Sequence, residues 1–161
     1  MSNNKASENS IVHYGSLPSV QVPDINAGGG VVFQAAEHAT RLLQELGYMC
    51  AIFGSAACLL YGNRRLPNDV DILVSTADDP EMIKLSLVNK SPLHFYLVRA
   101  KTPGATYKVL WYRHSQTIGR RLISSWHGTM MLPSLSLQSI IIKGTFPVVP
   151  LEVLLLHKLQ G

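Results

Sequence analysis

A five-residue apolar run that stops abruptly at a glycine sets the strongest limit on how this chain folds. Residues Met49 to Phe53 are all apolar, and Gly54-Ser55 follows at once. A run of this length bounded by a turn residue predicts a buried strand. Residues 56–61 then suit a short helix ended by Gly62. Because glycine lets a backbone approach a ligand closely, the junction is also a candidate binding position.

Periodic segments on both sides of this unit predict a mixed fold. Residues 32–46 repeat apolar side chains at three- and four-residue spacing, which indicates a helix ended by Gly47. Residues 69–74 alternate polar and apolar side chains, which indicates a strand buried on one face. The pattern within 113–139 assigns no element. The other predicted elements are a helix from Pro80 to Asn89 capped by Asp78 or Asp79, strands at 94–99, 107–112 and 139–143, and a helix at 150–160.

The order of these elements predicts an α+β fold of the α/β type, with a short mixed β-sheet flanked by helices. The chain has 161 residues, of which 47% are hydrophobic, enough for one core. Only 15% are charged and no repeat is present, which excludes collagen and coiled coil. Residues 1–30 are rich in Ser, Asn, Pro and Gly and are predicted to be a flexible leader. Residues 31–161 form the predicted domain.

Neither a membrane span nor a secretory signal is predicted. The longest apolar stretch, residues 48–62, is interrupted at Gly54-Ser55 and is shorter than the roughly 20 residues a bilayer requires. The N-terminus holds no apolar segment of the signal-peptide kind. The two cysteines, Cys50 and Cys58, lie in apolar surroundings, which favours buried free thiols in a reducing compartment. We therefore expect a cytoplasmic protein, and the nucleus is equally compatible.

Charge is divided unevenly along the chain. Residues 1–81 hold four Lys or Arg against nine acids, whereas residues 82–161 hold ten against Glu152 alone. Such a division suggests a cation-binding first half and a second half that faces a polyanion. The alternative is that the two halves interleave in space and the surface is mixed. Nucleic acid is thus compatible with the basic half, although no zinc spacing, aromatic RNA-binding motif or recognition helix accompanies it.

Two acidic residues on one predicted strand carry the main chemical signal. Asp69 and Asp71 are two residues apart, so their carboxylates lie on the same face and are able to share a hard divalent cation. Magnesium held by carboxylates and substrate phosphates is a common arrangement for phosphoryl chemistry. Alone, an Asp-Val-Asp on a strand is often a solvated face, and Gly54-Ser55 is often an ordinary turn. The two features together, in this order, are a far more specific signal than either one alone.

The combined pattern resembles a known family. Residues Ile52-Phe53-Gly54-Ser55, a thirteen-residue spacer and Asp69-Val70-Asp71-Ile72 are similar to the signature of the DNA polymerase β-like nucleotidyltransferase superfamily. Residues 54–73 resemble small fungal members in particular. Weaker similarity extends over 107–112, 119–121 and 147–160, so that it covers most of residues 31–161.

The resemblance implies transfer of a nucleoside monophosphate from a triphosphate such as ATP to an acceptor hydroxyl or phosphate. By analogy, Asp69 and Asp71 hold two Mg²⁺ ions that clamp the triphosphate and lower the pKa of the attacking hydroxyl. The other implied nucleotide-binding residues are Gly54 and Ser55 at the β- and γ-phosphates, Arg64 and Arg65 at the leaving pyrophosphate, and Lys158 at the phosphates. The alternatives are a solvated basic loop for Arg64 and Arg65 and an exposed helical lysine for Lys158.

Two departures from the family pattern leave catalysis undecided. Members normally supply a third carboxylate from a later strand as general base, but after Glu81 the only acid is Glu152. His127 is a candidate substitute base, and a packed or surface side chain is the alternative. The resemblance also implies further helices that complete the acceptor site, so we expect this domain to be C-terminally short: a trimmed copy, a decayed copy or an uncorrected gene model. General-base assistance is typically worth ~10²–10⁴ in rate, so its loss matters.

Three function classes therefore remain. The first is a metal-dependent nucleotidyltransferase with an unknown acceptor. The second is a catalytically inactive relative, a pseudoenzyme that binds nucleotide or acts through protein interaction. The third, a glycosyltransferase that grips a nucleotide-sugar with its Asp pair, ranks last because it does not require Gly54-Ser55 upstream. Ser-His-Asp hydrolysis has no supporting motif among the six histidines.

Overall fold

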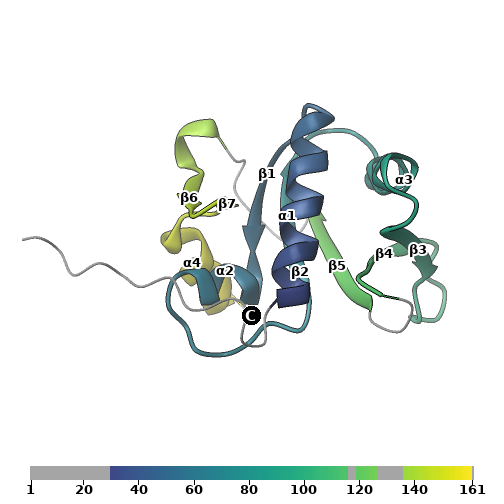
Figure 1. Cartoon of the computed structure of the whole chain (residues 1–161). Helices are drawn as coiled ribbons and strands as arrows, with labels where there is room; N and C mark the ends of the chain where they lie inside the picture. The colour runs from purple at the N-terminus through teal and green to yellow at the C-terminus, as the bar shows by residue number, and fades with distance from the viewer. Residues whose placement is uncertain (1–29, 116–118, 127–135, 161) are drawn as a thin grey trace, which may run out of the picture.

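A computed structural model of the chain describes residues 30–115, 119–126 and 136–160 (Figure 1). These residues form helices that pack on a β-sheet. The elements are α1 (Gly30–Glu45), β1 (Met49–Phe53), α2 (Gly54–Leu60), β2 (Val70–Ser75), α3 (Pro80–Lys90), β3 (Phe95–Arg99), β4 (Lys108–Arg113), β5 (Gly119–Trp126), the 3-10 helix η2 (Leu137–Ser139), β6 (Ile141–Lys143), β7 (Phe146–Val148) and α4 (Leu151–Gln160).

The strands form one seven-stranded mixed sheet in the order β3-β4-β5-β2-β1-β7-β6. Strands β1 and β2 pair antiparallel, whereas β5 joins β2 in parallel and β7 joins β1 in parallel. The hairpins β3–β4 and β6–β7 are antiparallel, and β5 follows β4 antiparallel. The predicted α+β class with a mixed sheet is therefore confirmed.

Helix α1 lies along one face of the sheet and supplies much of the core (Figure 1). Its buried side chains include Phe33, Ala36, Ala39 and Leu43, which recur at the spacing noted in the sequence. The buried strand predicted at 49–53 is confirmed: β1 is buried from its second residue onward. No helix in the described ranges is both long and apolar enough to cross a membrane.

The structure contains elements that the sequence pattern did not assign. Strand β5 lies within the unassigned stretch 113–139, and it pairs with β4 on one side and β2 on the other. Its sequence holds a glycine, two arginines and two serines, so its extended form depends on these neighbours rather than on local preference. Strand β7 is only three residues long and contains Pro147, which likewise conceals it from pattern analysis.

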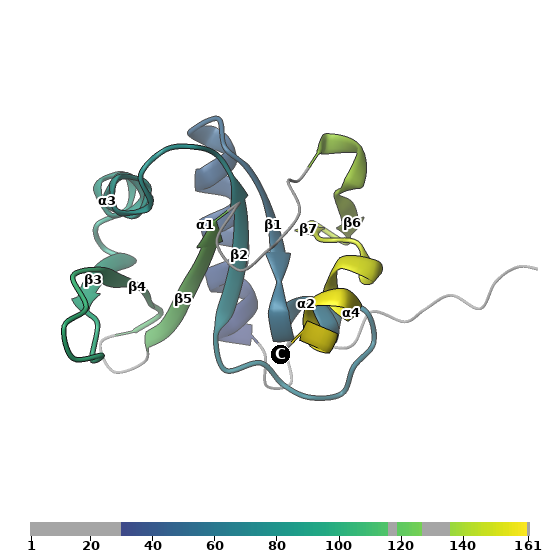
Figure 2. The same ribbon diagram turned by 180° about the vertical axis from the view of Figure 1, so that it is seen from behind.

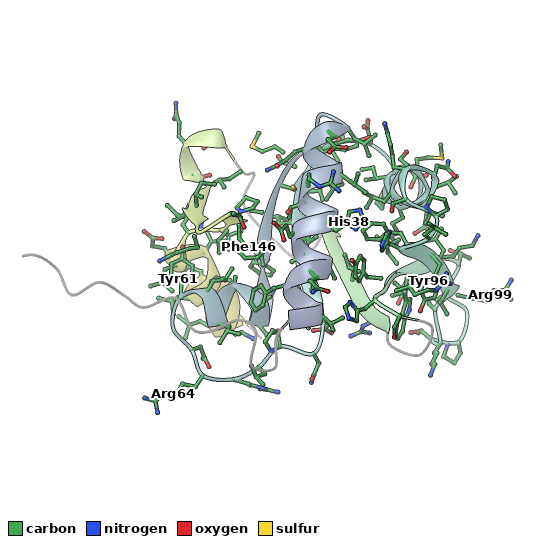
Figure 3. All side chains as sticks on the ribbon, in the orientation of Figure 1. His38, Tyr61, Arg64, Tyr96, Arg99 and Phe146 are labelled. Atoms are coloured by element: carbon green, nitrogen blue, oxygen red, sulfur yellow. The ribbon has the colours of Figure 1, made fainter. Side chains whose placement is uncertain are left out.

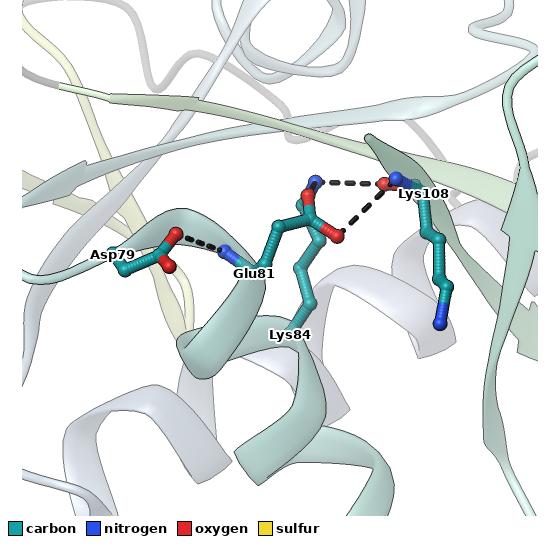
Figure 4. A network of polar contacts seen from close by, with 4 residues as sticks. All are labelled: Asp79, Glu81, Lys84 and Lys108. Carbon is teal, nitrogen blue, oxygen red and sulfur yellow. Dashed lines mark hydrogen bonds and ion pairs between the residues drawn. The ribbon is translucent and has the colours of Figure 1, made fainter. Parts of the chain in front are cut away.

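A buried lysine fixes α3 to the start of β4 (Figure 4). Asp79 caps the helix by accepting a hydrogen bond from the Glu81 amide at 2.9 Å, as one of the two predicted caps. The Lys84 ammonium donates to Glu81 Oε1 at 2.6 Å and to the Lys108 carbonyl at 2.7 Å. Glu81 Oε2 in turn accepts from the Lys108 amide at 3.2 Å. The helix and the strand are therefore joined through polar groups as well as through apolar packing.

Both cysteines are free, as predicted, and Cys50 is buried whereas Cys58 is half-buried. Burial raises the pKa of the Cys50 thiol to about 12. This thiol is therefore protonated at neutral pH and is unsuited to act as a nucleophile.

Candidate active site

The carboxylate of Asp71 rests against the backbone of Gly54. Gly54 begins α2 with φ +62°, in the left-handed region, and a Cβ added there would overlap Asp71 Oδ2. The antiparallel register of β1 and β2 pairs Phe53 with Asp71, so the backbone itself determines this approach. The glycine bend and the Asp71 carboxylate are therefore adjacent in space, as the sequence predicts.

Asp69 lies immediately before β2 and is held by an arginine from the neighbouring strand. Arg121 Nη2 donates to Asp69 Oδ2 at 2.9 Å, and both side chains are partly exposed. The parallel register of β2 and β5 pairs Val70 with Leu122, which places Arg121 beside Asp69. Residues 119–121 fall within the family resemblance, but the linear pattern indicates no role for Arg121. The cross-strand register that reveals its contact is absent from the linear pattern.

The electrostatics of the site centre on Asp71. Burial raises the pKa of this carboxyl to about 6, and the charge of Asp69 contributes in the same direction. The positive charges of Arg121 and Lys158 partly offset this rise in pKa. The charge of Asp69 disfavours ionisation of Asp71, and a bound cation would relieve this repulsion.

Helix α4 brings Lys158 toward the Asp pair, by which we mean Asp69 and Asp71. The ring of the preceding residue, His157, meets the ring of Phe53 edge-on with centroids 4.7 Å apart. Lys158 is exposed, and its charge lowers the pKa of Asp71. Lys158 therefore lies within electrostatic reach of Asp71. Ser55, in the first turn of α2, is half-buried beside the glycine bend.

The arginines of the loop before β2 have a different placement. Arg64 and Arg65 are both exposed, and Figure 3 shows Arg64 pointing away from the body of the protein. The Arg65 amide donates to Asn63 Oδ1 at 2.8 Å, a contact within the loop. The structure therefore does not bring Arg64 to the Asp pair, and a role for either arginine at pyrophosphate stays a prediction. His127, the candidate base, lies outside the described residues.

The carboxylates available to a metal are those of the Asp pair. Among the described residues, no group of three or more His, Cys, Asp and Glu side chains is placed to hold a metal ion. Glu152 lies near Tyr61 instead. Burial of Tyr61 is the larger cause of its raised pKa, and the charge of Glu152 is the second cause. The Asp pair fits one Mg²⁺ that also takes phosphate and water oxygens. For a second ion the described part of the chain supplies no further carboxylate, and Asp69 already binds Arg121.

The side of the sheet that points away from α1 continues outward from the Asp pair. Tyr112 packs edge-on against His38 of α1, with ring centroids 5.8 Å apart, so the preceding residue of the strand, Trp111, points to the opposite side. Figure 2, seen from that side, shows β2 and β5 in front of α1 with no described helix over them. We call this side the open face. Its residues include Asp69, Asp71, Tyr96, Val98, Val109, Trp111, Arg113 and Arg121.

A cavity of about 480 Å³ lies on the open face next to Asp69. Val98, Val109 and Trp111 contribute apolar surface to its lining, and Arg121, which pairs in register with Trp111, donates to Asp69. Its other lining residues are Asn68, Arg99, Ala100, Lys101, Thr102 and Tyr107. Asp69 of the Asp pair therefore borders a cavity lined by apolar, aromatic and cationic side chains.

Comparison with known proteins identifies the fold. At the level of sequence, neither a protein-family model nor a curated protein matches the chain. By structure, it is similar to an antigenic nucleotidyltransferase-like protein from Paracoccidioides brasiliensis, with a TM-score of 0.62 and 18% identity over 80% of this chain and 64% of that one. A candidate nucleotidyltransferase from H. pylori gives a TM-score of 0.47 and 13% identity over 78% and 58% of the two chains.

The chain thus spans less than two thirds of the length of either neighbour. The resemblance stated from residues 52–72 is confirmed at the level of the fold: this chain has the nucleotidyltransferase-like fold.

Proposed function

We propose that the protein binds a magnesium–nucleoside triphosphate complex at the Asp pair and transfers the nucleoside monophosphate to an acceptor. The observation that carries this proposal is the contact of the Asp71 carboxylate with the Gly54 bend, with Asp69 beside it. The nucleotidyltransferase-like fold supports it independently. Because Gly54 has no side chain, the Asp71 carboxylate lies directly against the backbone of the bend, beside the amides that would meet a phosphate.

Each residue of the site has a defined part in this proposal. Asp69 and Asp71 hold Mg²⁺, which when bound neutralises phosphate charge and lowers the pKa of an attacking hydroxyl. Gly54 and Ser55 contact the outer phosphates through backbone amides and the serine hydroxyl. Lys158 meets the phosphates from α4, since its charge already reaches Asp71.

The same geometry predicts slow turnover. A transferase of this kind benefits from a base that accepts the proton of the acceptor hydroxyl, an assistance worth ~10²–10⁴ in rate. Among the described residues no third carboxylate joins the Asp pair. We therefore expect turnover well below the ordinary enzyme range of about 1–10³ per second.

A second candidate function is nucleotide binding without transfer. It is favoured by one contact, the 2.9 Å ion pair of Arg121 with Asp69, which uses a carboxylate oxygen otherwise open to a metal. In this case the protein acts as a nucleotide-responsive partner module.

Calorimetric titration with ATP and the other triphosphates, with and without Mg²⁺, tests the shared part of both proposals. If binding requires the Asp pair, the double variant Asp69→Asn/Asp71→Asn is expected to show a large loss of nucleotide affinity. Glu37→Gln, an exposed acid on α1 on the other side of the sheet, is the matched control. Equal binding by wild type and the double variant would refute the site. Pyrophosphate release in the presence of a lysate of small molecules and RNAs then separates transfer from binding alone.

A further inference from the structure

The open face carries a continuous row of aromatic and cationic side chains beyond the Asp pair. The rings of Tyr96 and Trp111 stack across the β3–β4 hairpin with centroids 6.4 Å apart and planes 27° from parallel. The Arg113 guanidinium lies over the Tyr96 ring, 4.8 Å from its centroid. On β5, Arg121 pairs in register with Trp111. The row therefore runs from Arg113 through both rings to Arg121 and ends at Asp69.

The rings in this row are accessible. Tyr96 and Trp111 are both half-buried. Their sequence neighbours Phe95 and Tyr112, which point to the other face, are buried against α1. Trp111 also lines the 480 Å³ cavity, so part of its side chain borders that space. An aromatic surface of this kind offers a planar group something to stack on.

The charge around the rings is positive. Arg121, Lys101 and Arg99 line the cavity, and Asp69 is the one acid among the described residues that do so. Arg99 extends outward from the edge of the sheet, at the rim (Figure 3). Together with Arg113 these cations flank the rings on both sides, as expected of a surface that binds a negatively charged chain.

We infer that the open face binds single-stranded nucleic acid, RNA or DNA, whose bases stack on Trp111 and whose phosphates contact Arg113 and Arg121. Aromatic rings interleaved with cations suit this ligand, because unpaired bases offer planar faces and phosphates offer charge. Paired bases in a duplex are stacked on each other and offer no face to Trp111. If the nucleic acid is also the acceptor, it would extend from this row toward Asp69. Its role as acceptor rests on the proposed function, whereas its binding to the open face does not.

Fluorescence anisotropy with the full chain and labelled twelve-nucleotide strands of U and of dT tests the inference. Base stacking contributes about 1–3 kcal/mol per base, so Trp111→Ala is expected to weaken binding about 5- to 150-fold. Trp111→Phe keeps a stacking surface and is expected to retain most of the affinity. Arg113→Gln is expected to reduce the slope of log affinity against log salt by about 0.7, the value for one contact to a single strand.

The controls separate this inference from simpler explanations. Arg64→Gln removes an exposed cation that points away from the open face and is expected to leave strand binding unchanged. Heparin, a polyanion without bases, is expected to bind wild type and Trp111→Ala equally. Comparison of the U and dT strands shows whether the 2′-hydroxyl contributes.

Each outcome decides the inference. Strand binding that is no tighter than duplex binding, or that is unaffected by both Trp111→Ala and Arg113→Gln, overturns it. If Trp111→Ala fails to fold, Trp111→Phe and the Arg113→Gln salt slope still decide. The double variant Asp69→Asn/Asp71→Asn is expected to keep strand binding while losing nucleotide binding, so failure of one proposal is distinguishable from failure of the other.

Discussion

The two aspartates of the site are two residues apart in sequence, yet their positions are maintained in different ways. Asp71 is half-buried against the Gly54 backbone, where the β1–β2 register determines its place. Asp69 lies at the entrance of β2, and the partly exposed Arg121 side chain holds its carboxylate. The backbone geometry thus determines the position of Asp71, which is one half of the site. A partly exposed side-chain ion pair determines the position of Asp69, which is the other half. The two halves should therefore respond very differently to substitution.

The largest effect is expected at Gly54. Gly54→Ala adds a Cβ that overlaps Asp71 Oδ2 and places alanine at φ +62°. We expect a loss of about 2–5 kcal/mol in unfolding free energy, from the left-handed backbone and the overlap together. Gly144 is a matched control, because it has the same φ and nothing within 4 Å of an added Cβ. Gly144→Ala should cost only about 1–2 kcal/mol. Similar losses in both variants, measured by urea unfolding, would contradict the proposed contact.

The next effect concerns the charge of Asp71. Because its folded-state pKa, about 6, lies above the ordinary 3.8, the folded state binds this proton more tightly. The stabilisation is complete below pH 3.8 and is lost as the pH rises through 6. Asp71→Asn is therefore expected to be more stable than wild type at pH 8, by about 1–3 kcal/mol, with a smaller difference at pH 4. Asp69→Asn should retain much of the pH dependence, because burial is the larger cause. A destabilised Asp71→Asn at pH 8 would show that this half of the site is not strained by charge.

Replacement of Arg121 should affect binding more than stability. Exposed ion pairs contribute about 0–1 kcal/mol, so Arg121→Gln should change the unfolding free energy by no more than that. The variant also frees Asp69 Oδ2, and we expect the Asp pair to bind Mn²⁺ about 3- to 10-fold more tightly, as measured by electron paramagnetic resonance. Unchanged or weaker Mn²⁺ binding would mean that the ion pair does not compete with a metal.

The smallest effect is expected in the loop before β2. Arg64 is exposed and points away from the site, so Arg64→Gln should change stability by less than about 0.5 kcal/mol. It should also reduce nucleotide affinity less than Lys158→Gln, because the charge of Lys158 reaches Asp71. A larger loss from Arg64→Gln in the calorimetric titration would show that this loop moves onto the nucleotide.

Local sequence patterns predicted the half of the site that depends on the backbone. The apolar run 49–53, the glycine after it and the alternation at 69–74 each appear in the structure close to their predicted bounds. They were predictable because each element is specified by residues that are neighbours in the sequence. The bend was predictable because glycine readily adopts positive φ, so a glycine after a strand indicates a turn. The fold class followed from the same elements.

The half that depends on pairing between distant strands could not be predicted. Tyr96 and Trp111 are adjacent only through the β3–β4 register, and Arg121 reaches Asp69 only because β5 joins β2 in parallel. Strand β5 itself has no alternation that would reveal it. The excess of basic residues after position 81 was visible, but its concentration around two aromatic rings depends on pairing that a linear pattern does not contain.

The buried ammonium of Lys84 has a consequence for how the chain avoids misfolding. A shift of β4 by one residue would turn Trp111 toward α1 and bring Tyr112 to the exterior. The same shift would move the Lys108 carbonyl away from Lys84, which is only 8% exposed, and leave Glu81 as the remaining partner of its ammonium. A hydrogen bond to a charged group contributes about 1.5–3 kcal/mol, so the misaligned hairpin is penalised before any ligand is present. In a newly synthesised chain, the wrong alignment of β4 is therefore less stable than the native one.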